Sequence, residues 1–122
     1  MIKGIGVDIV EIPRLAEGLE RTPRLAERCF TQRERDYCEA QAHRAQHYAG
    51  RFAAKEAIAK AAGRPLPWHG VEIEHDEHRR PMVSLSGGAR EVLAGTEVLL
   101  SISHSGDYAV AFVILIQVGG EP

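Results

Sequence analysis

Two carboxylates in this chain occupy positions where they could bind a metal ion. Asp8 lies inside the apolar run IKGIGVDIV, residues 2–10, and Glu56 lies in the alanine-rich segment GRFAAKEAIAK, residues 50–60. A carboxylate inside an apolar strand is costly unless it is paired or binds a metal ion. Mg²⁺ commonly takes one or two protein carboxylates, and water and phosphate oxygens complete its shell. The pair therefore predicts a Mg²⁺ site; the alternatives are that Asp8 pairs with a buried arginine or faces solvent.

The glycines next to Asp8 bear on the same prediction. Gly4 and Gly6 share its face of the expected strand, so the backbone there carries no side chains. The lack of side chains leaves space above the backbone for a ligand. We expect this space to receive a ligand.

The alanine-rich segment also carries three cations, which a helical period distributes over two sides. At about 100° per residue, its alanines and Ile58 form one arc that should pack on a sheet. Glu56 and Lys60 then lie together at one margin of the arc, and Arg51 and Lys55 lie at the other. Beside a cleft, these cations would suit phosphate groups. The alternative is a Glu56–Lys60 surface pair worth about 0.3–0.5 kcal/mol, with Arg51 and Lys55 in solvent.

A third polar group lies near the end of the chain, in the segment SISHSGDY, residues 101–108. Ser103, His104, Ser105 and Asp107 suggest a catalytic triad, but neighbouring strand residues point to opposite faces, so His104 is badly placed to activate either serine. A strand that ends in a Ser-Gly turn does offer hydroxyl, imidazole and backbone N–H donors to a phosphate. Plain turn chemistry with a surface histidine is the alternative.

The basic residues Arg14, Arg21 and Arg24 form a cluster in a chain of formal net charge −2. Arg14 and Arg21 are about two helical turns apart and nearly share a face. Such a cluster could receive an acidic protein, or it could be a solvated helix face. The net charge argues against nucleic acid and anionic membrane as partners of the whole molecule.

Length and composition indicate one domain, residues 1–122, that is 44% hydrophobic and 26% charged. The two cysteines form no CxxC pair, and the spacing HRAQH at residues 43–47 lacks the glutamate of HExxH, so no zinc site is indicated. We expect these histidines, with His75 and His78, at the surface. The amino-terminal run contains a lysine and an acid, unlike a signal peptide, and no apolar stretch reaches the about 18 residues of a membrane span. We therefore expect a cytoplasmic protein.

The hydrophobic pattern predicts an α+β fold, in which an N-terminal strand is followed by several helices and then by a mostly antiparallel sheet. The expected strands cover residues 2–10, 71–75, 82–85, 98–104 and 108–118, the last two joined by a Ser-Gly-Asp hairpin turn. The expected helices begin at Pro13 and near residue 23, cover residues 32–42 and 45–62, and include a short one within 86–94.

Three segments in this order resemble the small, single-domain branch of the 4′-phosphopantetheinyl transferases, the holo-[acyl-carrier-protein] synthase type. They are GIGVDIVEI at residues 4–12, GRFAAKEAIAKA at 50–61 and SISHSGDYAVAFVI at 101–114. The resemblance spans residues 2–116, although the segment 63–69 is shorter than is usual in this family. It implies that coenzyme A gives its phosphopantetheine arm to a serine of apo acyl carrier protein, for fatty acid biosynthesis, and leaves adenosine 3′,5′-bisphosphate.

The resemblance also implies roles for individual residues. Asp8 and Glu56 match the carboxylates that bind Mg²⁺, and Lys60 matches a lysine that contacts the pyrophosphate; these three are the candidate catalytic residues. The positions near the adenosine and its 3′-phosphate match Arg51, His104 and Ser105. The basic positions of the carrier-protein docking helix match Arg14, Arg21 and Arg24. Phosphoryl transfer needs positioning and charge neutralisation, which this set could supply.

The last expected strand indicates an assembly. Tyr108, Val110 and Phe112 lie on one face, Ala111 and Val113 on the other, and both apolar faces need cover. A chain this short has little left to cover the second face. The resemblance implies a homotrimer with active sites between subunits, each site taking its two carboxylates from one chain and part of its coenzyme A contacts from the next. A charge at either position 112 or 113 is expected to dissociate it.

Two other classes of protein fit parts of the pattern. A non-catalytic module that binds coenzyme A or a nucleotide would keep Arg51, Lys60 and the His104 turn, but it would not need both Asp8 and Glu56. An interaction domain would use only the arginines. The sequence does not identify a general base.

Overall fold

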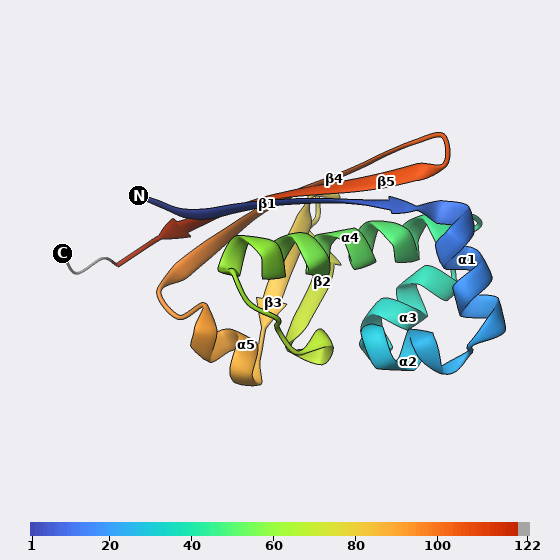
Figure 1. Cartoon of the computed structure of the whole chain (residues 1–122), viewed down its shortest axis with the longest axis horizontal. Coiled ribbons are helices and arrows are strands. Elements are labelled where there is room, and N and C mark those ends of the chain that lie inside the picture. Colours follow the sequence, from blue (N-terminus) through green and yellow to red (C-terminus); the bar gives the residue numbers. More distant parts are fainter. Residues whose placement is uncertain (120–122) are drawn as a thin grey trace.

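A three-stranded antiparallel sheet and one long helix form the centre of the structure. The computed structural model describes residues 1–119, and in it the sheet has the order β1-β5-β4, with β1 (Ile2–Glu11), β4 (Thr96–Ser105) and β5 (Tyr108–Gln117). Helix α4 (Arg44–Ala62) runs along one face of this sheet (Figure 1). Gly63, with φ of 75°, ends the helix in the left-handed conformation that favours glycine.

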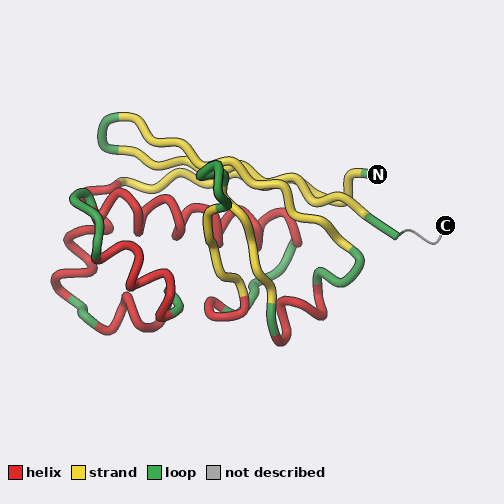
Figure 2. The backbone as a smooth tube through the Cα atoms, turned by 180° about the vertical axis from the view of Figure 1, so that it is seen from behind, coloured by secondary structure: helices red, strands yellow, loops and turns green. Residues whose placement is uncertain are grey.

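The remaining elements pack on the side of α4 that faces away from this sheet. Helices α1 (Ile12–Arg21), α2 (Arg24–Cys29) and α3 (Gln32–Glu39) gather at its amino-terminal end. A hairpin of β2 (Val71–His75) and β3 (Pro81–Leu85) crosses behind its middle, as the reverse view shows (Figure 2). A 3₁₀ turn (Trp68–Gly70) precedes β2, and helix α5 (Gly87–Val92) follows β3.

The predicted α+β fold is confirmed, with each expected helix and strand present. The capping box at Thr31 forms as its spacing predicts, since the Thr31 and Glu34 side chains each bond the other's backbone N–H. Helix α3 ends at Glu39 rather than at residue 42, because a turn follows. Residues 120–122 of the expected domain lie outside the described residues. Within residues 1–119, no helix has the length and apolar character needed to cross a membrane.

Two glycines allow the backbone of α4 to lie directly on β1. A Cβ atom on Gly4 would overlap the carbonyl oxygen of Ala61, and one on Gly6 would overlap that of Ala57. Our expectation that a ligand fills the space above these glycines is therefore wrong, because the helix backbone fills it. Ala53, Ala54 and Ala57 are fully buried and Ala61 is half-buried, so small residues line both sides of the contact.

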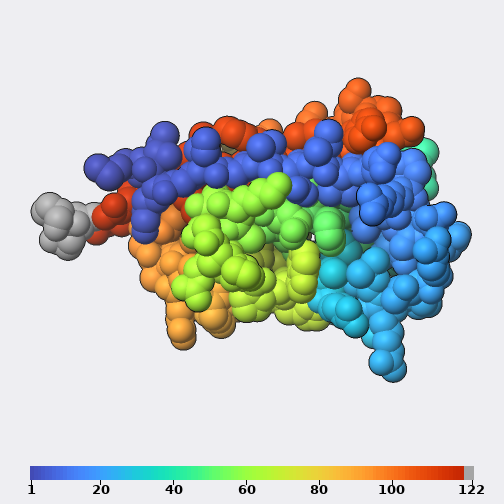
Figure 3. Space-filling model, viewed as in Figure 1, coloured from blue at the N-terminus to red at the C-terminus, as the bar shows by residue number. Residues whose placement is uncertain are grey.

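The opposite face of β1 and β5 has no cover from the described residues. Ile5, Val7 and Ile9 are 63%, 53% and 61% exposed, and Phe112, which pairs with Val7, is 44% exposed. Strand β1 lies along the surface for its whole length (Figure 3). Val113, in contrast, is fully buried toward α4. Of the two positions expected to dissociate the assembly, only Phe112 lies on the open face; a charge at Val113 would act on the monomer core instead.

The contact between β1 and α4 generates a stability prediction. Gly6→Ala should lower the free energy of unfolding by about 1–3 kcal/mol, because the new methyl group forces the two backbones apart. The control is Gly18→Ala in α1, whose Cβ would meet Leu25 Cδ2 at 3.4 Å. That change should leave stability equal or raise it by up to about 1 kcal/mol, as Ala favours helix over Gly. Urea unfolding followed by circular dichroism measures the stability of both variants. Equal unfolding midpoints for Gly6→Ala and Gly18→Ala would contradict a close contact between β1 and α4.

Candidate active site

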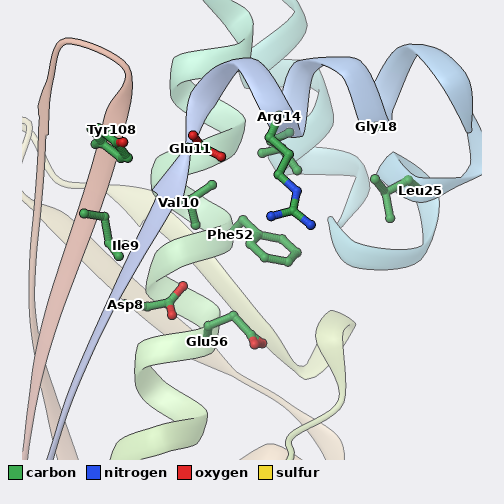
Figure 4. A pocket seen from close by; sticks show the side chains of 11 residues that line it. Asp8, Ile9, Val10, Glu11, Arg14, Gly18, Leu25, Phe52, Glu56 and Tyr108 are labelled. Atoms are coloured by element: carbon green, nitrogen blue, oxygen red, sulfur yellow. The ribbon is translucent and has the colours of Figure 1, made fainter.

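An open cavity of about 580 Å³ lies where the end of β1 meets helices α1 and α4. Asp8 and Glu56 both line it, and so does Arg14 (Figure 4). Much of the remaining lining is apolar and consists of Ile9, Val10, Leu15, Leu25, Phe52 and Tyr108. The two carboxylates that the sequence singled out are thus brought together, because the close contact with α4 sets residue 8 of the strand beside residue 56 of the helix.

Asp8 is paired with Lys60 across the contact between strand and helix. The Lys60 ammonium donates to Asp8 Oδ1 at 2.8 Å and to the Val7 carbonyl oxygen at 3.1 Å. The hydrogen bond to Asp8 and then its charge raise the pKa of Lys60 above its usual value, so the ammonium remains charged at neutral pH. The alternative of a Lys60–Glu56 surface pair is therefore wrong, and so is the alternative that Asp8 pairs with an arginine.

The two carboxylates fit Mg²⁺ better than a metal ion that needs a full protein ligand set. Among residues 1–119, no cluster of three or more His, Cys, Asp or Glu side chains is placed to hold an ion. Asp8 and Glu56 together offer hard oxygen donors at an open cavity, where water and substrate oxygens can complete a shell. That donor set is the one that Mg²⁺ uses in phosphate-handling sites.

Lys55 has a structural role at the other side of the same helix. Its ammonium lies 2.7 Å from Glu34 Oε1 and donates to the carbonyl oxygens of Cys29 and Trp68 at 2.9 Å each. Glu34 Oε2 accepts the Ile73 N–H at 2.7 Å. Burial lowers the pKa of Lys55, and the Glu34 charge opposes that shift. Lys55 was expected either to contact a phosphate or to lie in solvent, and neither expectation is correct. Instead, the buried pair fixes α4 against α3, the 3₁₀ turn and β2.

A second cavity, of about 160 Å³, lies beside α4 next to the β4–β5 hairpin and is basic. Arg51 and His104 line it, as the resemblance implied for one binding region, and the structure adds His47, His75 and Arg79. No carboxylate belongs to its lining. Ser105 is exposed at the end of β4 and is not part of this lining. Such a surface suits an anion with several oxygens, for example a phosphate group.

Arg51 is buried at this cavity and keeps an unused donor. It is 3% exposed, its guanidinium lies 4.4 Å above the Tyr37 ring, and one terminal nitrogen is 3.2 Å from His75 Nδ1. Its Nε has no hydrogen-bond partner within the described part of the chain. Burial, and then the charge of Arg51, lower the pKa values of His47 and His75 below the usual range. Both imidazoles are therefore neutral at pH 7.

Sequence reasoning did not single out His47, His75 or Arg79 as site residues. It took the histidines as solvated surface residues; His75 is exposed as expected and His47 is half-buried, but both line this cavity. The available signal was the run HDEHRR at residues 75–80, which gathers four basic side chains next to a strand. Arg79 is also the single non-glycine residue with positive φ, 64°, in residues 1–119. A backbone conformation that L side chains rarely adopt often marks a functional loop.

The two cavities lie on different sides of one helix. Arg51 and Glu56 are five residues apart on α4, which is about 140° around its axis. One chain therefore does not present Arg51 and His104 to the cavity that holds Asp8 and Glu56.

The arginines proposed for docking spread over two helices. Arg14 lines the first cavity at its rim. Arg21 is exposed near the end of α1 and lies 3.2 Å from Glu17, and Arg24 is exposed at the first residue of α2. Of the three, only Arg14 is brought next to the carboxylates.

Comparisons with known proteins give consistent results. The chain matches the family model described as the 4′-phosphopantetheinyl transferase superfamily over residues 4–113. It is 47% identical to the holo-[acyl-carrier-protein] synthase of Geobacter metallireducens, over 97% of this chain and all of that protein, and 49% identical to that of Desulforudis audaxviator, over 95% and 94%.

Solved structures are similar over the same length. Holo-ACP-synthase from Plasmodium yoelii has a TM-score of 0.87 and 31% identity, covering 98% of both chains. The holo-(acyl-carrier-protein) synthase from Bacillus anthracis, in complex with CoA (3′,5′-ADP), has a TM-score of 0.82 and 34% identity, covering 98% of this chain and 99% of that one.

The buried Lys55–Glu34 pair generates a second stability prediction. Lys55→Met should lower the free energy of unfolding by about 3–5 kcal/mol, because it leaves Glu34 buried without its counter-charge. The double variant with Glu34→Gln should recover much of this loss, since glutamine still accepts the Ile73 N–H and carries no charge. Urea unfolding of both variants checks this, and a double variant no more stable than the single one would contradict it.

Proposed function

The chain belongs to the 4′-phosphopantetheinyl transferase superfamily, and we propose that it uses Asp8 and Glu56 as the metal ligands of a holo-[acyl-carrier-protein] synthase. It transfers the 4′-phosphopantetheine group of coenzyme A to a serine of apo acyl carrier protein, in fatty acid biosynthesis, and releases adenosine 3′,5′-bisphosphate. The observation that carries the assignment of residues is the convergence of both carboxylates at one open cavity, with Lys60 hydrogen-bonded to one of them, Asp8.

The residues of this cavity answer the needs of phosphoryl transfer. Mg²⁺ held by Asp8 and Glu56 would neutralise charge on the diphosphate of coenzyme A as the bond to phosphorus breaks. Lys60, one helical turn from Glu56, donates to diphosphate oxygens and stabilises the leaving phosphate. Because the lysine side chain is 56% exposed, it is free to turn toward a substrate in the cavity.

The basic cavity is suited to the other end of coenzyme A. We assign Arg51 and His104 to its 3′-phosphate and adenosine, with Ser105 on the adjoining turn. The unused Nε of Arg51 and the absence of carboxylates from the lining support this. Arg79 adds a second cation to the same cavity, and the neutral imidazole of His75 adds a hydrogen-bonding group; both are proposed as further contacts for the phosphate.

We propose that the protein assembles as a homotrimer, and the separation of the two cavities and the uncovered sheet face support this. One coenzyme A molecule that reaches both kinds of cavity needs two chains, because one chain places them on different sides of α4. The exposed apolar residues Ile5, Val7, Ile9 and Phe112 provide a surface to bury between subunits. A three-fold arrangement closes such contacts without leaving an open end.

The carrier protein is proposed to dock on α1 and α2. Arg14 lies at the rim of the cavity, and Arg21 and Arg24 extend the basic surface outward. The proposal includes a cytoplasmic location, which agrees with two buried cysteines, Cys29 and Cys38, that form no disulfide.

The metal site makes the first functional prediction. Asp8→Ala and Glu56→Ala should each stay folded and lose about 10²-fold or more in kcat, because each removes a ligand for charge that must be neutralised. EDTA should abolish wild-type transfer and Mg²⁺ should restore it. The readout is the mass gain of one phosphopantetheine group on the carrier serine. Glu77→Ala, an exposed carboxylate of the β2–β3 loop, is the control and should keep full activity.

The same assay separates the enzyme from the alternative module. A protein that binds coenzyme A but gives no mass gain at any Mg²⁺ concentration would be the non-catalytic coenzyme A or nucleotide-binding module. Full activity of either alanine variant at matched Mg²⁺ would remove the proposed metal site.

The docking surface makes the second functional prediction. Arg14→Glu and Arg21→Glu should raise the KM for carrier protein by roughly tenfold and leave the KM for coenzyme A unchanged, because rim charges act on encounter and register. Higher ionic strength should raise the wild-type KM for carrier protein as well. Arg90→Glu on α5 is exposed and distant, and serves as the matched control. If all three variants have the same KM for carrier protein, the arginines do not dock the carrier protein and are only solvated.

The assembly makes the third functional prediction. The wild-type protein should have a mass of about 40 kDa by light scattering, three times the 13.4 kDa of the chain. Phe112→Glu should dissociate it and remove transfer activity together, because the charge enters the apolar interface. Met82→Glu, at a residue that is 50% exposed on β3, should do neither. A wild-type monomer with full activity at nanomolar concentration contradicts the trimer.

A further inference from the structure

The Lys60 ammonium lies on the carboxylate that the metal ion needs. Its Nζ is 2.8 Å from Asp8 Oδ1 and 3.1 Å from the Val7 carbonyl oxygen. Of the two proposed metal ligands, Asp8 thus already has a cation partner within the chain. Glu56 has none in the described part of the chain, although Lys60 is only one helical turn away.

The two cations compete for the same position. Mg²⁺ binds carboxylate oxygens at about 2.1 Å, so an ion on Asp8 would lie within a few ångströms of the ammonium. Like charges at that separation repel each other appreciably even in water. The ion must therefore displace the ammonium from Asp8 or bind against its charge.

The packing determines which partner can move. Gly6 holds β1 against the carbonyl oxygen of Ala57, so the Asp8 backbone cannot retreat from α4 without losing that contact. The Asp8 side chain is only 17% exposed, and without a cation it would be a half-buried, uncompensated charge. The Lys60 side chain is 56% exposed and flexible. Lys60 is therefore the part that leaves.

We propose that Lys60 is an internal competitor of the metal ion in the free protein and becomes a ligand of the diphosphate only when coenzyme A binds. This inference rests on the metal site of the proposed function. The diphosphate offers oxygens to both cations, so it relieves their competition. Metal and coenzyme A consequently bind with positive coupling, and each raises the affinity for the other by the same factor.

The test measures Mn²⁺ binding to the whole protein by titration calorimetry and electron paramagnetic resonance, with no carrier protein present. In the absence of coenzyme A, Lys60→Met should bind Mn²⁺ about tenfold more tightly than the wild type, because a nearby like charge is gone. Lys3→Met is the matched control, because it removes one positive charge from β1, the strand that carries Asp8. Lys3 contacts Thr96, and its loss should leave the Mn²⁺ affinity within about twofold of the wild type.

The second arm adds coenzyme A. Wild-type affinity for Mn²⁺ should rise by about tenfold or more when coenzyme A is saturating, whereas the rise in Lys60→Met should be smaller, because its competition is already removed. Lys60→Met should nevertheless transfer phosphopantetheine more slowly than the wild type. Tighter metal binding combined with slower transfer is a result that a merely structural lysine would not give.

Two outcomes overturn the proposal, and they differ in what they leave intact. If Asp8→Asn abolishes Mn²⁺ binding but Lys60→Met binds no more tightly than the wild type, Lys60 is not a competitor and the metal site stands. If Asp8→Asn in the Lys60→Met background leaves Mn²⁺ binding unchanged, the ion binds elsewhere, and the metal assignment of the proposed function fails as well.

Discussion

The direct contact between the backbones of strand β1 and helix α4 is the constraint on which the rest of the structure depends. Glycines on the strand and alanines on the helix leave no side chain between them, so the separation of the two elements is set by van der Waals contact. Asp8 belongs to one element, and Glu56 and Lys60 belong to the other. The geometry of the candidate site is thus a direct consequence of small residues that have no chemistry of their own.

Helix α4 also explains why an alanine-rich segment carries so many charges, since it meets a different environment on each side. Glu56 lines the open cavity and Lys60 pairs with Asp8, whereas Lys55 enters a buried ion pair and Arg51 lines the basic cavity. The buried pair is well satisfied, because both Lys55 and Glu34 make further hydrogen bonds to backbone groups. A pair of this kind contributes a fixed rotation of the helix more than net stability. With the rotation fixed, Glu56 is held toward the cavity.

Two features of the single chain would both be explained by the proposed trimer. Its basic cavity and its carboxylate cavity face different directions, and its central sheet leaves one apolar face open. Burying that face against further copies of the chain would cover the apolar residues. It would also bring the basic cavity of one chain and the carboxylate cavity of the next within reach of one coenzyme A molecule. Assembly and site formation would then be the same event, with the hydrophobic effect supplying the free energy that positions the basic residues.

The sequence by itself determined the order and type of the elements, because hydrophobic periods, capping residues and glycine stops are local signals. It also singled out Asp8, Glu56, Lys60, Arg51 and His104, whose types and spacing carry chemistry and match one family. It could not determine what each side of a helix faces. The period placed Lys60 beside Glu56, yet its ammonium crosses to Asp8, 52 residues away in the chain. Lys55 pairs with Glu34 and His75 approaches Arg51 for the same reason. Only the tertiary structure decided these partners, because a long-range ion pair depends on how close two backbones can come, and here the glycines of β1 set that distance.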